Sequence, residues 1–188
     1  MLLNLLTPRG QRLPLACCVA TALCALSVPT LADDSRDGSR RGDRIEARLK
    51  GFAEVPAVSS AASGRFKARI DSASMSLSYE LSFSGLEGDV RQAHVHFGQH
   101  GVNGGIMVWL CQSAVNVSPV ASTPQCPQSG TVSGTISAAD VVGPAGQGIA
   151  TTEFAEMVKA ISAGVAYANV HSSKFPLGEI RGQLRDDD

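Results

Sequence analysis

The chain has few histidines, few aromatic residues and little net charge. Each of these features limits the classes of function that the protein can have. Only 4 of its 188 residues are histidine, aromatic residues make up 5%, and the formal net charge is −1. A nucleic-acid-binding domain normally carries an excess of positive charge and often aromatic stacking residues. We therefore predict no basic face for nucleic acid and no nucleic-acid partner.

Common catalytic motifs are also missing from the sequence. It has no phosphate-binding loop, no HExxH pattern, no Ser-His-Asp order and no serine on a nucleophile elbow. A hydrolase is therefore unsupported. The longest apolar run, about residues 15–28, is too short to cross a bilayer comfortably, so we predict no membrane span.

The first 32 residues have the features of a secretory signal peptide. Arg9 and Arg12 precede the apolar run, and Thr30-Leu31-Ala32 is a small-residue cleavage signal. A lipid on Cys17 is an alternative, although the residues before it fit an attachment signal poorly. We predict a signal peptide over 1–32, a flexible leader over 33–43 and one domain over 44–185, in the periplasm or secreted.

Removal of the signal peptide leaves only Cys111 and Cys126. Two cysteines in an oxidising compartment are expected to pair, so we predict a disulfide. The alternative is a pair of thiolate metal ligands, which the long spacing and the exported context disfavour.

Alternating apolar and polar residues dominate the rest of the chain. This two-residue period is typical of strands with one buried and one solvent-exposed face, and it favours antiparallel sheets. The predicted strands lie near residues 44–50, 65–70, 75–83, 89–98, 105–112, 130–137, 165–171 and 178–184. The stretch GIMVWLCQ is apolar on both faces, which predicts a central strand. The fold class is all-β: an antiparallel β-sandwich or flattened Greek-key barrel of about eight strands.

One segment, TTEFAEMVKAISAG, has helical periodicity instead. Its apolar residues recur at i, i+3, i+4 and i+7. We predict one short helix, capped by Thr151 or Thr152, ended by Gly164 and packed on the sheet.

Three of the four histidines fall on predicted strands. His94 and His96 are two residues apart and therefore share one face, opposite Ala93 and Val95. In VAYANVH the same rule places His171 on the polar face. If these strands are neighbours, three imidazoles meet on the solvent-facing side of the sheet.

Such a cluster suits copper or zinc, with the fourth coordination position open to water, an outside ligand or His100. His100 lies in the turn-rich stretch GQHGVNGG and is equally explained as an exposed loop histidine. The cluster itself has two alternatives: a structural polar network, or contacts to an organic ligand or protein partner.

Three polar residues are candidates to orient the ligating imidazoles by hydrogen bonds. Asn169 shares a face with His171, and Glu179 and Arg181 share a face of the last strand. A carboxylate that orients a ligating imidazole is a common arrangement. A plain surface ion pair between Glu179 and Arg181 is the alternative, as is a loop-holding role for Glu54.

Three separated motifs resemble the chordin-type (CHRD) domain family. They are ARLKGFAEVPAVSSAASG, LSYELSFSGLEGDVRQAHVHFGQHGVNGGIMVWL and GVAYANVHSSKFPLGEIRGQL, in the right order over about residues 45–184. The family includes repeats of animal chordin, an extracellular antagonist of bone morphogenetic proteins, and many exported bacterial proteins. The resemblance implies an extracytoplasmic β domain without implying a particular activity.

The stretch HVHFG also resembles the copper-binding strand of Cu/Zn superoxide dismutase. That resemblance implies copper ligation by His94 and His96, with His171 as a third ligand. A bridging histidine and a zinc-loop cluster are missing from the sequence. We therefore predict an exported, copper-first metal-binding protein, with zinc as the alternative ion. The other hypotheses are a protein- or ligand-binding module with structural histidines and, less favoured, a dismutase-like enzyme.

Overall fold

The computed structural model describes residues 44–187, which contain nine strands and one α-helix. The strands are β1 (Arg44–Lys50), β2 (Ser63–Asp71), β3 (Ser76–Ser84), β4 (Val90–Phe97), β5 (Gly105–Cys111), β6 (Gly130–Ile136), β7 (Ala166–Ser172), β8 (Ile180–Gln183) and β9 (Arg185–Asp186). The helix is α1 (Phe154–Ser162), and three single-turn 3-10 helices lie at Gly51–Ala53, Ala138–Asp140 and Ala145–Gln147. The predicted signal peptide and leader lie outside the described residues.

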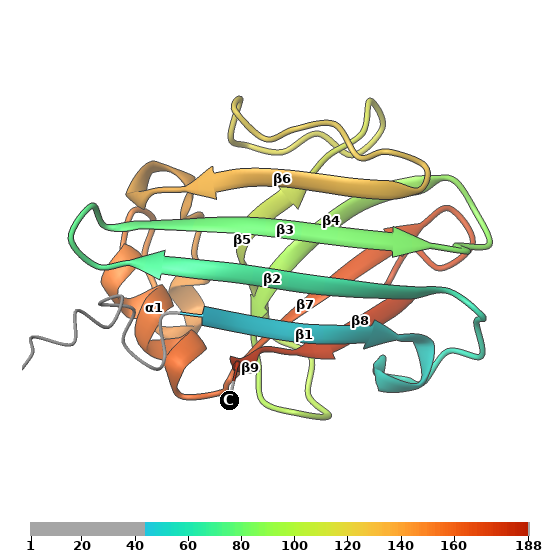
Figure 1. Cartoon of the computed structure of the whole chain (residues 1–188), viewed down its shortest axis with the longest axis horizontal. Helices are drawn as coiled ribbons and strands as arrows, with labels where there is room; N and C mark the ends of the chain where they lie inside the picture. The colour runs from blue at the N-terminus through green and yellow to red at the C-terminus, as the bar shows by residue number, and fades with distance from the viewer. Residues whose placement is uncertain (1–43, 188) are drawn as a thin grey trace, which may run out of the picture. The chain divides into compact units, whose positions relative to one another are not determined.

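The strands form one antiparallel sheet that curls into a nearly closed, flattened barrel. Its order is β5-β4-β7-β8-β1-β2-β3-β6, and the short β9 pairs with β1. Figure 1 shows β6, β3, β2 and β1 as a front layer, with β5, β4, β7 and β8 crossing behind it. The predicted all-β class, strand number and single helix are confirmed.

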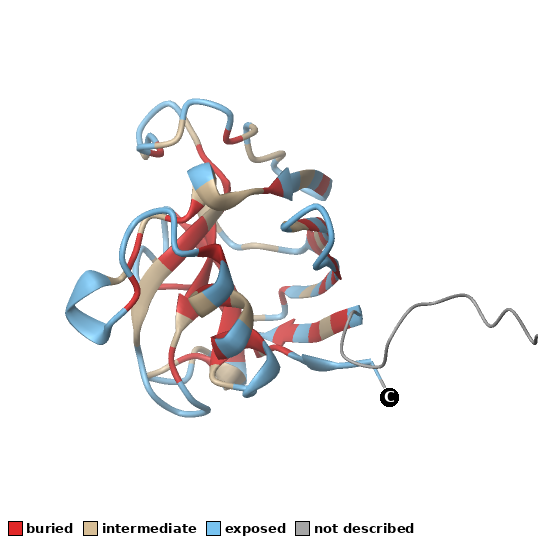
Figure 2. Ribbon diagram, turned by 90° about the vertical axis from the view of Figure 1, so that its left-hand side faces the viewer, coloured by how far each residue is buried: buried red, intermediate tan, exposed pale blue. Residues whose placement is uncertain are grey.

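The front layer has the one-sided burial that alternation predicts. In β2 and β3 every second residue is buried, and Phe66 and Leu81 are completely inaccessible. Figure 2 shows buried residues concentrated in the strands and exposed residues in the connecting loops. The apolar core therefore fills the space between the two layers.

Strand β5 corrects one prediction, because it ends the strand order rather than lying in its centre. Its free edge is covered locally: Val142 N–H donates to the carbonyl of Met107, and Gly105 N–H donates to Gln147 Oε1. On its outer face, Trp109 is half-buried and packs against the neighbouring His94 of β4. A strand covered in this way can be apolar on both faces while remaining at an edge.

Helix α1 was predicted correctly except at its first residue. Phe154, Met157 and Ile161 are buried as the apolar stripe predicts, and Gly164 follows the helix with a φ of 69°. The N-cap is Glu153, not Thr151 or Thr152. The carboxylate of Glu153 accepts the backbone N–H of Ala150, which fixes the turn before the helix.

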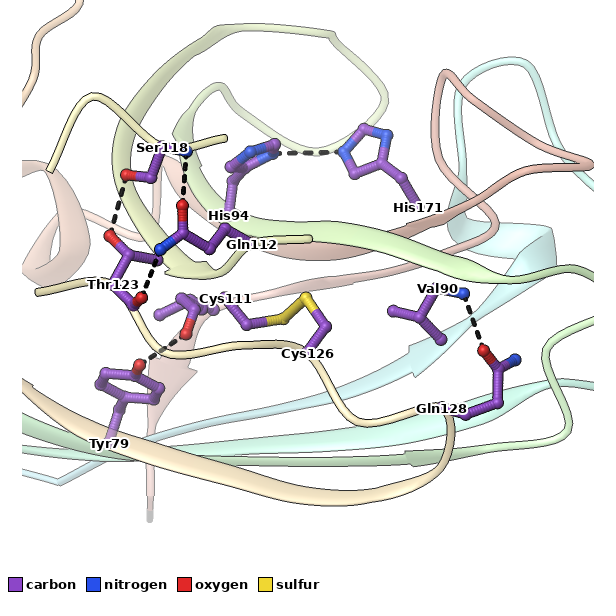
Figure 3. The surroundings of a disulfide bond; sticks show 11 residues. Tyr79, Val90, His94, Cys111, Gln112, Ser118, Thr123, Cys126, Gln128 and His171 are labelled. Atoms are coloured by element: carbon purple, nitrogen blue, oxygen red, sulfur yellow. Dashed lines mark hydrogen bonds between the residues drawn. A yellow bond between two sulfur atoms is a disulfide. The ribbon is translucent and has the colours of Figure 1, made fainter. Parts of the chain in front are cut away.

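The predicted disulfide joins Cys111 to Cys126, with their Cα atoms 4.9 Å apart. Figure 3 shows it beside the polar contacts of Gln112, which donates to the carbonyl of Thr123 and accepts the N–H of Ser118. These contacts tie the irregular loop after β5 to the barrel. In the described part of the chain, no helix is long and apolar enough to cross a membrane.

Candidate metal centre

Strands β4 and β7 bring the three predicted histidines together. The two strands pair antiparallel, with His94 opposite Asn169, His96 opposite Tyr167 and Gln92 opposite His171. One potential ligand atom from each of His94, His96 and His171 lies within 4.8 Å of the other two. The predicted convergence of residues from two remote segments is confirmed.

The expected exposure of this face is wrong. The side chains face away from the apolar core, yet His94, His96 and His171 are only 1%, 8% and 6% exposed. The reason is that loops from elsewhere in the chain cover this side of the barrel. The site is therefore a buried polar cluster rather than an open surface.

Two backbone carbonyls fix the tautomers of two histidines. His96 Nδ1 lies 2.9 Å from the carbonyl oxygen of Gly104, and His171 Nδ1 lies 3.0 Å from that of Pro176. A carbonyl only accepts, so each Nδ1 donates its proton and each Nε2 keeps a lone pair. An outer carbonyl that leaves the other ring nitrogen free is the usual environment of a metal-binding histidine.

His94 completes the cluster by contacting His171. Its Nδ1 lies 3.3 Å from His171 Nε2, as Figure 3 shows, so without a metal His94 donates to that lone pair. Nε2 of His94 and Nε2 of His96 are then buried acceptors without a hydrogen-bond partner among the described residues. Buried polar atoms rarely stay unsatisfied, so these two nitrogens are suited to accept a bond from water, another proton donor or a cation.

Burial keeps the histidines neutral. Desolvation, reinforced by His171 and His96, lowers the pKa of His94 to about 2. Desolvation also lowers the pKa of His96 to about 4, against the opposing hydrogen bond to Gly104, and lowers the pKa of His171. Metal ions bind neutral imidazole. At neutral pH, therefore, no histidinium has to lose a proton before an ion can bind.

Aromatic side chains hold the rings of the cluster in place. His96 stacks on Tyr167 with ring centroids 4.8 Å apart and planes within 1° of parallel. His94 meets Trp109 edge-on at 4.3 Å. These contacts restrict ring rotation and so preorganise the ligand atoms.

Arg181 fastens a loop over the cluster. Its guanidinium lies 3.3 Å from the centre of the Tyr167 ring, on which it stacks, and it is 2% exposed. It donates to the carbonyls of Gln99 and Val102 at 3.2 and 2.8 Å and to Asn103 Oδ1 at 3.1 Å. Arg181 therefore positions the loop whose Gly104 carbonyl orients His96.

The three predicted supporting residues have different roles. Asn169 Oδ1 lies 3.1 Å from His171 Nε2, the candidate ligand nitrogen, so Asn169 does not orient the ring through the opposite nitrogen, which bonds to Pro176. Arg181 acts through the loop and Tyr167. Glu179 accepts from the Ser60 hydroxyl and the Glu87 backbone N–H, at 2.7 and 2.9 Å, rather than from a histidine.

Sequence reasoning missed the burial of Glu54. Its carboxylate is 6% exposed and lies so close to Gly178 that a Cβ there would collide with it. Desolvation raises its pKa to about 7, although Arg181, Val55 and Asn169 act in the opposite direction. Position in the sequence gave no signal for this, because Glu54 follows a 3-10 turn outside any strand.

His100 is not part of the cluster in the described chain. It is exposed in the loop between β4 and β5, outside the group formed by the other three histidines. The loop approaches the site through Gly104 and Asn103 instead. The candidate centre is thus three imidazoles without His100.

The comparison with known protein families agrees with the architecture. The family model described as the CHRD domain matches residues 45–184, which include every strand that carries the cluster. Neither the curated proteins nor the solved structures contain a match to the chain. The chain belongs to the CHRD domain family.

Proposed function

We propose that this protein is an exported metal-binding protein that holds one transition-metal ion through His94, His96 and His171. The observation that carries the proposal is the convergence of three neutral imidazoles, two of them oriented by backbone carbonyls. Nε2 of His94 and Nε2 of His96 are buried without a hydrogen-bond partner within residues 44–187. A cation would satisfy the lone pairs that the protein leaves unmatched.

Copper is the first choice of ion and zinc the second. Imidazole nitrogen suits both, and Cu(II) lies above Zn(II) in the affinity series of divalent ions. The near-complete burial of the ligands favours holding an ion over turning over a large substrate.

Export to the periplasm or the exterior is part of the proposal. CHRD domains occur in extracellular proteins, and the Cys111–Cys126 disulfide is consistent with an oxidising compartment. The predicted signal peptide over residues 1–32 would direct this export. In such a compartment copper is expected as Cu(II), the ion that three imidazoles suit.

The test is to titrate Cu(II) and Zn(II) into untagged mature protein and to follow bound metal and melting temperature. A site present only in the folded state adds about 2.7 kcal/mol at a free metal concentration of 100 Kd. For a domain of this size that raises Tm by roughly 8 °C. We expect one ion per chain.

His100 provides the matched control. His100→Gln should bind and respond to metal like the unaltered protein, because His100 lies outside the cluster. His96→Gln and His171→Gln should each remove the stabilisation while remaining folded by circular dichroism. Equal metal responses in all variants, or none in any, would favour a ligand- or protein-binding module in which the histidines are structural. Superoxide turnover by the copper-loaded protein would instead support the enzyme hypothesis.

A further inference from the structure

The exposed face of β1 and β2 concentrates positive charge. Six of the chain's 16 Lys and Arg residues point outward from these two strands. They are Arg44, Arg48, Lys50, Arg65, Lys67 and Arg69. The low net charge of the chain did not predict this concentration of cations. We call these six residues the cationic face; the strands that carry them, β1 and β2, belong to the front layer in Figure 1.

The strand register places like charges directly opposite each other. Arg44 pairs with Arg69, and Arg48 pairs with Arg65, across β1 and β2. Directly opposed like charges destabilise a sheet. Glu46, which bonds to Arg65, compensates part of this charge, and an anion bound along the strands would compensate the positive charge that remains.

Three carboxylates, Glu46, Asp71 and Glu80, share this face with the six cations and neutralise only part of their charge. Glu46 bonds to Arg65, and that bond together with the charges of Arg65, Arg48 and Lys67 lowers the pKa of Glu46. Glu80 lies opposite Lys67 on β3. A shallow depression of about 510 Å³ runs over this region, lined on both sides by these charged residues.

The neighbouring strands continue the face with hydroxyl groups. Ser78 and Ser82 lie on β3, opposite Arg69 and Arg65, and Ser133 and Thr135 extend the same surface on β6. The aromatic residues of β2 and β3 are all buried, and the exposed large apolar residues of the described chain lie outside β1, β2, β3 and β6. The face therefore offers charge and hydroxyl hydrogen bonds but neither base-stacking rings nor membrane-inserting side chains.

We propose that the cationic face, with the adjoining hydroxyl rows, binds an anionic polysaccharide. Guanidinium groups pair with sulfate or carboxylate, and serine and threonine hydroxyls bond to sugar hydroxyls. A linear chain lying across a flat sheet needs no deep pocket. This surface is on the layer opposite the histidines and is independent of metal binding.

The test measures binding of dextran sulfate to the unaltered protein and to two double variants over a range of salt. R48Q/R69Q removes one member of each arginine pair. K159Q/K174Q makes the same change of charge on α1 and on the loop before β8. We expect R48Q/R69Q to weaken binding at least about tenfold at low salt and to reduce the slope of log K against log salt by about two. K159Q/K174Q should bind like the unaltered protein.

The melting temperature separates loss of the site from loss of the fold. R48Q/R69Q replaces two exposed side chains and removes both like-charge neighbours and attractions to Glu46 and Asp71, so its Tm should lie close to that of the unaltered protein. Neutral dextran should not bind, and duplex DNA and phosphatidylglycerol vesicles should bind more weakly than dextran sulfate. Equal weakening by both double variants, or equal or tighter binding to DNA or vesicles, would overturn the proposal.

Discussion

At the scale of single residues, the ring nitrogens of the histidines govern what the cluster can do. Gly104 and Pro176 each accept one Nδ1 proton, so the chemistry of the cluster is left to His94 and to the Nε2 atoms of His96 and His171. Strand alternation predicted that these residues share a face. It could not predict the tautomers, because both carbonyls come from loops.

The lowered histidine pKa values make the metal-free protein sensitive to acid. Unfolded histidine titrates near 6.5, whereas His94 and His96 titrate at about 2 and about 4 in the folded protein. Below pH 6.5 the unfolded chain binds more protons, so stability falls as pH falls. His96 alone should cost about 3 kcal/mol by pH 4.

The titration of Glu54 changes the folding stability in the opposite direction as the pH falls. Its pKa rises from 4.5 to about 7 on folding, so it adds stability as the pH falls from 7 toward 4.5. Three histidines outweigh one carboxyl, so urea unfolding should show a net loss between pH 6.5 and 4. His96→Gln should show a smaller loss, and a loss as steep as that of the unaltered protein would contradict the assignment.

At the scale of elements, strands and loops differed in how far sequence predicted them. The alternation in β2 and β3 reports burial on one side, and the structure follows it from Phe66 to Ile70 and from Leu77 to Phe83. Met75, also predicted on the buried face, lies before β3 and is exposed. On β7 the same reasoning failed, because all seven residues are buried. Loop contacts such as Asn103 Nδ2 to the carbonyl of Val55 cover that face, and no local pattern encodes them.

Arg181 is the residue through which β8 controls the loop between β4 and β5. Arg181→Lys keeps the charge but loses the planar fork that holds Gln99, Val102 and Asn103 together. We expect faster hydrogen exchange in residues 99–104. We also expect metal affinity to fall by roughly 10- to 100-fold, as it does when residues that orient metal ligands are substituted. Lys174→Arg is the control, since Lys174 lies on another loop. Unchanged exchange and unchanged affinity in Arg181→Lys would show that the clamp does not position His96.

At the scale of the whole molecule, the barrel carries two separate polar sites, a buried histidine cluster and an exposed cationic face. The outer side of β4 and β7 carries the covered histidines, and the outer side of β1 and β2 carries the exposed cations. The sequence predicted the barrel and its disulfide from alternation and cysteine number. It did not predict the cationic face, because net charge averages over surfaces that the strand order separates.

The most direct test of the metal centre is X-ray absorption spectroscopy of the protein loaded with one equivalent of Cu(II). The account predicts three imidazole nitrogens at about 2.0 Å from the ion, and two in His96→Gln if that variant retains copper. The spectrum of His100→Gln should match that of the unaltered protein. A copper ion with fewer than three imidazole ligands, or a spectrum that changes in His100→Gln but not in His96→Gln, would contradict the account.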